Sequence, residues 1–243
     1  MKIWGKTDIG KARRTNQDDF FCEVILDEVV IFCVCDGMGG TNGGHIASKY
    51  AAREFIHEIK KQIRIDISDD DAKKILAGAV WSANNFVFDM ASCDASLRDM
   101  GTTLVGGFLI SNKAYLANVG DSRCYHVDQN NITQVTKDHS LVQQLLDNGQ
   151  ISINEKKSHP KKNYITRAVG VSREITSDIF KVKFDKNEFL LLCSDGLYNL
   201  VDNELMKEII LMDINIDKKC DKLIEIANEN GGSDNITAVI LEF

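Results

Sequence analysis

The sequence has one proline, no CxxC pair among its seven cysteines and no long apolar run. The odd cysteine count and these spacings disfavour zinc and disulfides and favour small apolar thiols in a reducing cytosol. No apolar run approaches the ~18 residues of a membrane span. The opening residues, MKIWGKTDIG, contain no apolar signal-peptide core. We therefore expect a cytoplasmic protein that does not associate with a membrane.

The chain is also short of positive charge. It has 29 Lys and Arg against 36 Asp and Glu, a net charge of −7, which argues against nucleic acid or anionic lipid as the main partner. Its 243 residues suffice for one core, so we expect a single domain over residues 1–243, and nothing demands more than a monomer. A GK[ST] phosphate loop and a GxSxG nucleophile elbow are both missing.

The most informative pattern is a buried strand that ends in an aspartate. Residues 29–35 are apolar without a break, most of them β-branched or aromatic, and Asp36 follows at once. The pattern recurs where FLLLCS ends in Asp195, and it runs in reverse where Asp234 precedes ITAVIL. A carboxylate at the end of a buried strand is costly unless a positive charge meets it. Three such aspartates predict a shared cation site.

The periodicity elsewhere predicts a mixed chain of helices and strands. Apolar residues recur every four positions from about 45 to 64, and a second amphipathic helix follows aspartates 69–71, whose charges suit a helix start. The strands follow one another through short turns and the helices come in pairs, which favours a largely antiparallel sheet over a doubly wound parallel one. The predicted strands include residues 21–26 and a hairpin turning at 111–113, and further helices are predicted at 138–149, 202–212 and 217–229.

The acidic residues at these strand ends offer only oxygen ligands, which suit magnesium, manganese or calcium and not zinc. Asp121, in the GDSR turn, is a fourth candidate, and Gly37 could add its carbonyl. Converging carboxylates favour two metals over one, because their repulsion must be cancelled. Two ions about 3.5–4 Å apart can activate a shared water for in-line attack on phosphorus. With Arg13 or Arg14 gripping phosphate oxygens, the pattern predicts a phosphate-ester hydrolase.

Each piece has a simpler interpretation on its own. One Asp-Gly after a strand is usually a turn. His45 and His139 are expected as surface or capping residues and not as acids or ligands. If residues 13–20 are extended, Asp18 and Asp19 point to opposite faces, and only one of them can join a site. The recurrence of the strand-end aspartates is what favours a site over separate turns.

Nine segments occur along nearly the whole chain in an order that is specific to one family: RRTNQDDF, CDGMGG, GGHIAS, MGTT, GDSRCY, TKDHSLVQQLLDNGQI, HPKKNYITRAVG, LCSDGLYN and GGSDNITAV. With them the sequence resembles the metal-dependent protein serine/threonine phosphatases of the protein phosphatase 2C (PPM) family, bacterial type. The resemblance implies an α+β fold, a four-layer αββα sandwich of two mainly antiparallel β-sheets flanked by pairs of helices. It also implies hydrolysis of phosphoserine and phosphothreonine in proteins, without a phosphoenzyme, opposite a serine/threonine kinase.

The resemblance assigns metal ligands at the predicted strand ends. Asp36 would bridge two Mn2+ or Mg2+ ions, which hold the attacking water between them, and Gly37 would give its carbonyl. Asp195 and Asp234 would complete the pair of sites. Asp121 matches the ligand of a third, weaker ion, which Asp195 would share.

The resemblance also assigns residues that meet the substrate. Arg13 matches the phosphate-binding arginine, Asp18 the acidic residue beside the metal-bound waters, and residues 138–167 the flap that touches the protein substrate. Met38 departs from animal relatives, which carry a histidine there as proposed general acid. A thioether cannot donate a proton, so a water on a metal is the expected donor.

Two rival functions are compatible with parts of the pattern. One is a regulator of the stage-II-sporulation type that acts on a single phosphorylated anti-sigma antagonist. The other is an inactive relative that only binds phosphoproteins, although such proteins have typically lost metal aspartates and here all four positions are filled. The intact RxxNQD, flap and HPxxNxIT segments favour the general phosphatase.

Overall fold

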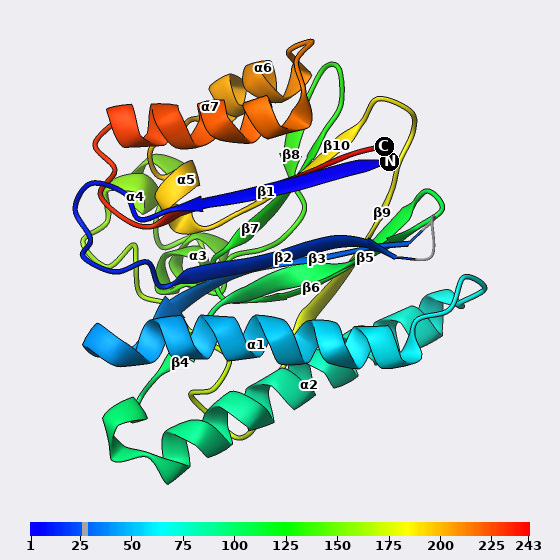
Figure 1. Cartoon of the computed structure of the whole chain (residues 1–243). Helices are drawn as coiled ribbons and strands as arrows, with labels where there is room; N and C mark the ends of the chain where they lie inside the picture. The colour runs from blue at the N-terminus through cyan, green and yellow to red at the C-terminus, as the bar shows by residue number, and fades with distance from the viewer. Residues whose placement is uncertain (26–28) are drawn as a thin grey trace.

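The computed structural model describes residues 1–25 and 29–243, which form two β-sheets packed face to face (Figure 1). One sheet has the order β1-β11-β10-β7-β8 and the other β2-β3-β5-β6-β9, with β4 paired to the end of β3. Each strand runs antiparallel to its neighbours in these orders. The strands are β1 (Lys2–Asp8), β2 (Asp18–Ile25), β3 (Val29–Met38), β4 (Gly101–Thr102), β5 (Leu104–Ile110), β6 (Lys113–Val119), β7 (Arg123–Val127), β8 (Ile132–Gln134), β9 (Asp178–Lys183), β10 (Phe189–Cys193) and β11 (Ile236–Glu242).

Paired helices cover the outer faces of both sheets. In Figure 1, α6 and α7 lie on the sheet that contains β1, and α1 and α2 lie on the sheet that contains β2. The short helices α3, α4 and α5 gather at the end of the sandwich that is opposite the two termini. This arrangement confirms the four-layer αββα prediction. The helices are α1 (Gly40–Gln62), α2 (Asp69–Cys93), α3 (Leu141–Asp147), α4 (Ile153–Ser158), α5 (Asp195–Tyr198), α6 (Asn203–Leu211) and α7 (Ile216–Glu229), with a 3-10 turn at Ala95–Leu97.

Strand β3 explains why its sequence is apolar without alternation. Its odd-numbered side chains, such as Ile31 and Cys33, pack in the core beneath α1 and α2. Its even-numbered side chains, such as Phe32 and Val34, pack in the core between the two sheets. Because both faces are buried, the strand has no polar side before Asp36.

The predicted elements match the observed ones with differences mainly at their ends. The hairpin forms as expected, with Ile110 opposite Lys113 across the two turn residues. Strand β2 covers the predicted 21–26 as far as Ile25, and residue 26 lies outside the described ranges. Helix α1 begins at Gly40 and not near His45, because its first turn packs closely against the end of β3.

The second helix has a narrower buried stripe than its sequence indicates. The residues predicted at its apolar face are buried except that Phe86 is 42% exposed and Met90 is half-buried. Phe86 stacks on Tyr50 of α1, with ring centroids 5.7 Å apart. In the described ranges, no helix is long and apolar enough to cross a membrane.

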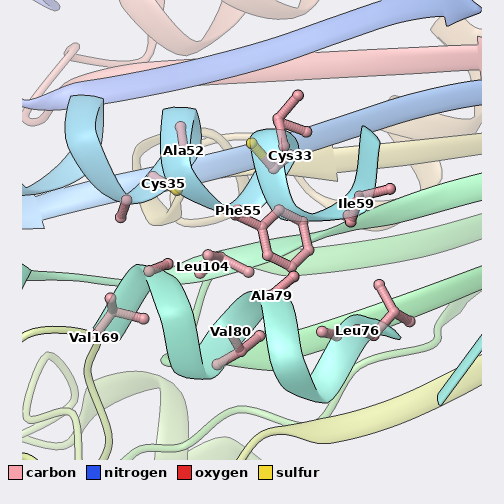
Figure 2. Packing of buried hydrophobic residues seen from close by; sticks show 14 of the residues in the cluster. Cys33, Cys35, Ala52, Phe55, Ile59, Leu76, Ala79, Val80, Leu104 and Val169 are labelled. Carbon is pink, nitrogen blue, oxygen red and sulfur yellow. The ribbon is translucent and has the colours of Figure 1, made fainter. Parts of the chain in front are cut away.

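Phe55 of α1 lies at the centre of the packing between the two long helices (Figure 2). Its side chain is fully buried. We expect Phe55→Ala to lower the free energy of unfolding by about 3–5 kcal/mol, because it removes buried apolar surface and leaves a cavity. Phe86→Ala, at an exposed ring, should cost about 1 kcal/mol or less. Urea denaturation of both variants and the wild type checks this; equal losses would contradict the assignment of Phe55 to the core.

Candidate active site

Asp36 sits near the end of β3, where hydroxyl and amide groups fix its backbone. The Asp36 N–H donates to Thr103 Oγ1 and the Asp36 carbonyl accepts from the Thr103 N–H, both at 2.9 Å. Thr103 Oγ1 also lies 2.7 Å from Ser122 Oγ, so the backbone at Asp36 is tied to the residue next to Asp121. The strand end is therefore held rigidly while the carboxylate stays available.

Gly37 is required by the close approach of α1. A Cβ at this position would lie 2.0 Å from the carbonyl oxygen of Gly44, which is shorter than any real contact. The N–H of Gly37 donates to the carbonyl of Gln17 at 3.0 Å. The glycine thus lets β3 pass directly into α1 and brings residues 13–17 beside the strand end.

Asp195 and Asp234 come from the other sheet. Asp195 follows β10 and is the first residue of α5, and Asp234 lies two residues before β11. Strands β10 and β11 are neighbours and antiparallel, so the end of one lies beside the start of the other. A Cβ on Gly196 would meet the Asn235 carbonyl at 2.0 Å, which shows how closely the two segments approach.

Asp121 enters the same region from the turn after β6. Gly120 has φ +101°, a conformation that favours glycine, and its N–H donates to Nδ1 of His139 at 3.2 Å. The Tyr198 hydroxyl donates to the carbonyl oxygen of Asp121 at 3.1 Å. Both contacts bond the backbone of this turn and leave the buried Asp121 carboxylate facing the other acidic residues.

These residues line one cleft of about 500 Å³, and Asp195 places it beside the start of α5. Six of the seven predicted site residues line it, and Asp18 does not. Arg14, the alternative to Arg13, lines it too, as does Met38. Two residues of the predicted flap form part of the wall, Asn163 and Ile165. The six predicted lining residues are Arg13, Asp36, Gly37, Asp121, Asp195 and Asp234.

Asp18 lies opposite Asp36 in the register of β2 and β3. It is buried, and its Oδ2 accepts hydrogen bonds of 2.6 Å from both Ser194 Oγ and Thr237 Oγ1. Its Oδ1 is buried with no hydrogen-bond partner among the described atoms. Asp19 takes the other face of the strand, half-buried, as the alternation predicts. Of the two aspartates, Asp18 is the one that is buried beside Asp36.

Arg13 reaches the cleft from the loop after β1. Its Nη2 lies 2.7 Å from Oδ2 of Asp234, and its side chain is 54% exposed. The hydrogen bond to Asp234 raises the pKa of Arg13, so the guanidinium stays charged. One edge of the planar fork is thus held by the protein while the group remains open to the cleft.

The carboxylates of the cleft raise one another's pKa. Burial, with the charges of Asp121 and Asp234, raises the pKa of Asp195 to about 8. Burial, with the charges of Asp18 and Asp195, raises the pKa of Asp36 well above its usual range. Burial raises the pKa of Asp121 to about 6. Ionising all of them together therefore requires a positive charge within the cleft.

The donors in the cleft suit hard divalent cations. Every acidic group that lines it offers oxygen. In the part of the chain that the structure describes, no three His, Cys, Asp or Glu side chains converge on one ion. Ions that keep several waters and take one or two protein carboxylates each do not need three such side chains together.

Several residues that build the site escaped the sequence prediction. Asn235 donates to the carbonyls of Ile9 and Thr15 and accepts from the N–H of Gln17, so it anchors the loop that carries Arg13. Ser194 and Thr237 hold Asp18. All three lie within three residues of a predicted aspartate, and that proximity is the only signal in the sequence that could have found them.

The prediction that His139 is a surface or capping residue is wrong. The side chain is buried, with Nδ1 accepting from Gly120 and Nε2 lying 3.2 Å from Asp178 Oδ2. Burial lowers the pKa of His139, so the ring is neutral near pH 7. It supports the turn before Asp121 and does not line the cleft.

Comparison with known proteins finds relatives that match nearly the whole chain. The family model described as Protein phosphatase 2C matches residues 10–239. The serine/threonine phosphatase stp of Listeria welshimeri is 37% identical over 237 residues, which cover 98% of this chain and 94% of that protein. The crystal structure of serine/threonine phosphatase Stp1 from Staphylococcus aureus superposes with a TM-score of 0.93 at 30% identity, covering 100% and 94% of the two chains. The catalytic domain of the phosphatase PstP, solved with two manganese ions, gives a TM-score of 0.85 at 29% identity, covering 98% and 96%.

The raised carboxylate pKa values predict how stability depends on pH. Unfolded aspartates ionise near pH 4, so between about pH 5 and 8 the folded metal-free protein binds more protons than the unfolded chain. Its stability should therefore fall as the pH rises through this window. Thermal unfolding in chelator from pH 5 to 8 should show the fall, and saturating Mn2+ should remove most of it.

Asp195→Asn is the matched variant for this measurement because an amide cannot ionise. Its metal-free melting temperature should depend less on pH than that of the wild type. A wild-type melting temperature that rises from pH 5 to 8 in chelator would show that burial and repulsion do not raise the pKa values of these carboxylates.

Proposed function

The chain belongs to the protein phosphatase 2C family and is a serine/threonine phosphatase, and from this premise we propose that the cleft between the two sheets hydrolyses phosphoserine and phosphothreonine in proteins. The observation that carries the proposal is the meeting of Asp36, Asp195 and Asp234 from three strand ends in one cleft. A phosphomonoester needs such a site because its dianion must be neutralised before a nucleophile can approach.

Divalent metal ions are required by the family's chemistry, and we assign their ligands to the aspartates of the cleft. Asp36, with the carbonyl of Gly37, would hold both ions of a pair, and Asp195 and Asp234 would complete it. Asp121 and Asp195 would hold a third, weaker ion. Bound ions supply a water of lowered pKa and neutralise charge on the phosphoryl group. We propose manganese as the ion that supports activity in vitro, with magnesium as the alternative.

Arg13 would bind the substrate's phosphate. Asp234 holds one nitrogen of the guanidinium, and the exposed remainder can donate to two phosphoryl oxygens. This orients the phosphorus for attack from within the cleft. Asp18 would accept a hydrogen bond from the attacking water through Oδ1, since Ser194 and Thr237 already occupy Oδ2.

The leaving serine or threonine oxygen needs a proton that Met38 cannot give. Met38 lines the cleft where a donor would be useful, but a thioether has no acidic hydrogen. The acidic residues around it would bind cations as carboxylates, so they carry no proton to donate. We propose that water in the open cleft protonates the leaving oxygen.

We propose one phosphatase domain over residues 1–243, with residues 138–167 as its flap, acting as a monomer. Its substrates must be phosphorylated by an opposing serine/threonine kinase. Five cysteines are buried as core side chains, which supports action in a reducing cytoplasm.

Phosphate release from a phosphothreonine peptide tests the proposed function. We expect activity with Mn2+, none with excess chelator, and a loss of at least about 100-fold in Asp36→Asn, because a ligand of both ions is removed. Activity that survives chelation would contradict the metal mechanism. Tight binding of the peptide without release under any metal would favour the inactive binding protein instead. Release confined to one anti-sigma antagonist would favour the narrower regulator.

Arg13 and Arg14 can be separated by kinetics with p-nitrophenyl phosphate, a substrate small enough to touch only the cleft. Arg13→Ala should lower kcat/KM by about 10- to 100-fold, the effect of removing charge-assisted hydrogen bonds to phosphate. Arg14→Ala should change it by less than about threefold, as expected for an exposed charge. The reverse order would transfer the phosphate-binding role to Arg14.

A further inference from the structure

Helix α4 in the flap buries almost no apolar side chain against the rest of the protein. Five of its six residues are exposed, and Lys156 alone is half-buried. A capping box between Ser152 and Glu155 completes its first turn. So short a helix is not stable in water by itself. Its position must therefore depend on a contact with the rest of the protein.

Lys156 makes that contact. Its Nζ lies 3.1 Å from Oδ2 of Asp138 and 2.5 Å from Oε1 of Gln143, and the lysine side chain is 17% exposed. The Asp138 side chain is only 4% exposed, so the ammonium group meets a buried carboxylate. A charge-assisted hydrogen bond in such surroundings is stronger than a surface ion pair.

Asp138 connects this contact to the catalytic cleft. Arg123 grips Asp138 with Nε and Nη2, at 2.9 and 2.7 Å, and Gln134 donates to it at 2.8 Å. The Arg123 guanidinium lies 3.6 Å from the ring centroid of Tyr198, whose hydroxyl bonds the carbonyl of Asp121. Because Arg123 alone can neutralise Asp138, removing the lysine leaves no unpaired buried charge.

The flap returns to the protein body six residues after the end of α4, at Tyr164. The Leu141 N–H donates to the carbonyl of Tyr164 at 2.8 Å, and the Thr166 N–H donates to that of His139 at 2.7 Å. Between α4 and this return, Asn163 forms part of the wall of the cleft. Only residues 159–162 separate α4 from Asn163, so a displacement of α4 would act on that wall through a short connection.

We propose that Lys156 is a positioning residue that fastens the flap to Asp138 and thereby sets the wall of the cleft that a phosphoprotein meets. The part of this inference that concerns substrate rests on the proposed function. Lys156 does not line the cleft and has no role in the chemical step. Its loss should affect how a protein substrate binds and leave the chemistry intact.

Amide hydrogen exchange tests the fastening without any activity. Lys157 is the matched control, since it lies on the same helix, is exposed and makes no ion pair in the described structure. In Lys156→Met, amides of residues 151–163 should exchange roughly five- to tenfold faster, as expected for loss of a hydrogen bond between charged groups. Lys157→Met should match the wild type. Unchanged exchange in Lys156→Met, or equal increases in both variants, would overturn the proposal.

Steady-state kinetics test the consequence for substrate. With a phosphothreonine protein, Lys156→Met should raise KM by about three- to tenfold with kcat within about twofold, and p-nitrophenyl phosphate should be turned over as by the wild type. Lys156→Arg should restore most of the KM. An equal loss with both substrates, or an unchanged KM for the protein, would overturn the positioning role. A wild type that releases no phosphate would refute the proposed function, while the exchange experiment would still decide whether the lysine fastens the flap.

Discussion

Repulsion between buried carboxylates is the constraint on which the rest of this structure depends. Asp36, Asp121 and Asp195 are brought together from two different sheets; burial raises the pKa of all three, and the charge of Asp121 raises the pKa of Asp36 and of Asp195 further. A fold does not retain such a cluster for stability, because a hydrophobic replacement would pack at lower cost. The cluster is stable when divalent cations neutralise it, and the same cations neutralise a phosphate ester. The repulsion that destabilises the metal-free fold is therefore the same property that binds the cations needed for the chemistry.

The surrounding polar groups hold these carboxylates without neutralising them. Thr103 bonds the backbone of Asp36, and Ser194 and Thr237 donate neutral hydroxyls to Asp18. Positive side chains do not neutralise the centre of the cleft. Arg13 pairs with Asp234 from the exposed side, and the guanidinium of Arg123 pairs with Asp138. The negative potential of the cleft is thus preserved for cations.

The sequence predicted the strand-end aspartates because their signal is local: an apolar strand, an acidic residue and a glycine stand next to each other. It could not decide between Asp18 and Asp19, since that choice depends on which face of β2 meets Ser194 and Thr237. It misjudged His139, whose partners lie far along the chain. It placed the start of α1 too late, because close packing of glycines outweighs their low helix propensity.

The measurement that tests the central claim most directly is calorimetric titration of the metal-free protein with Mn2+ near pH 7, in two buffers of different ionisation enthalpy. Carboxyl groups whose pKa is raised by burial and repulsion must lose protons when a cation binds. The account predicts at least two ions bound per chain with net release of protons, and both reduced in Asp36→Asn. Manganese binding without proton release, or binding that Asp36→Asn leaves unchanged, would contradict it.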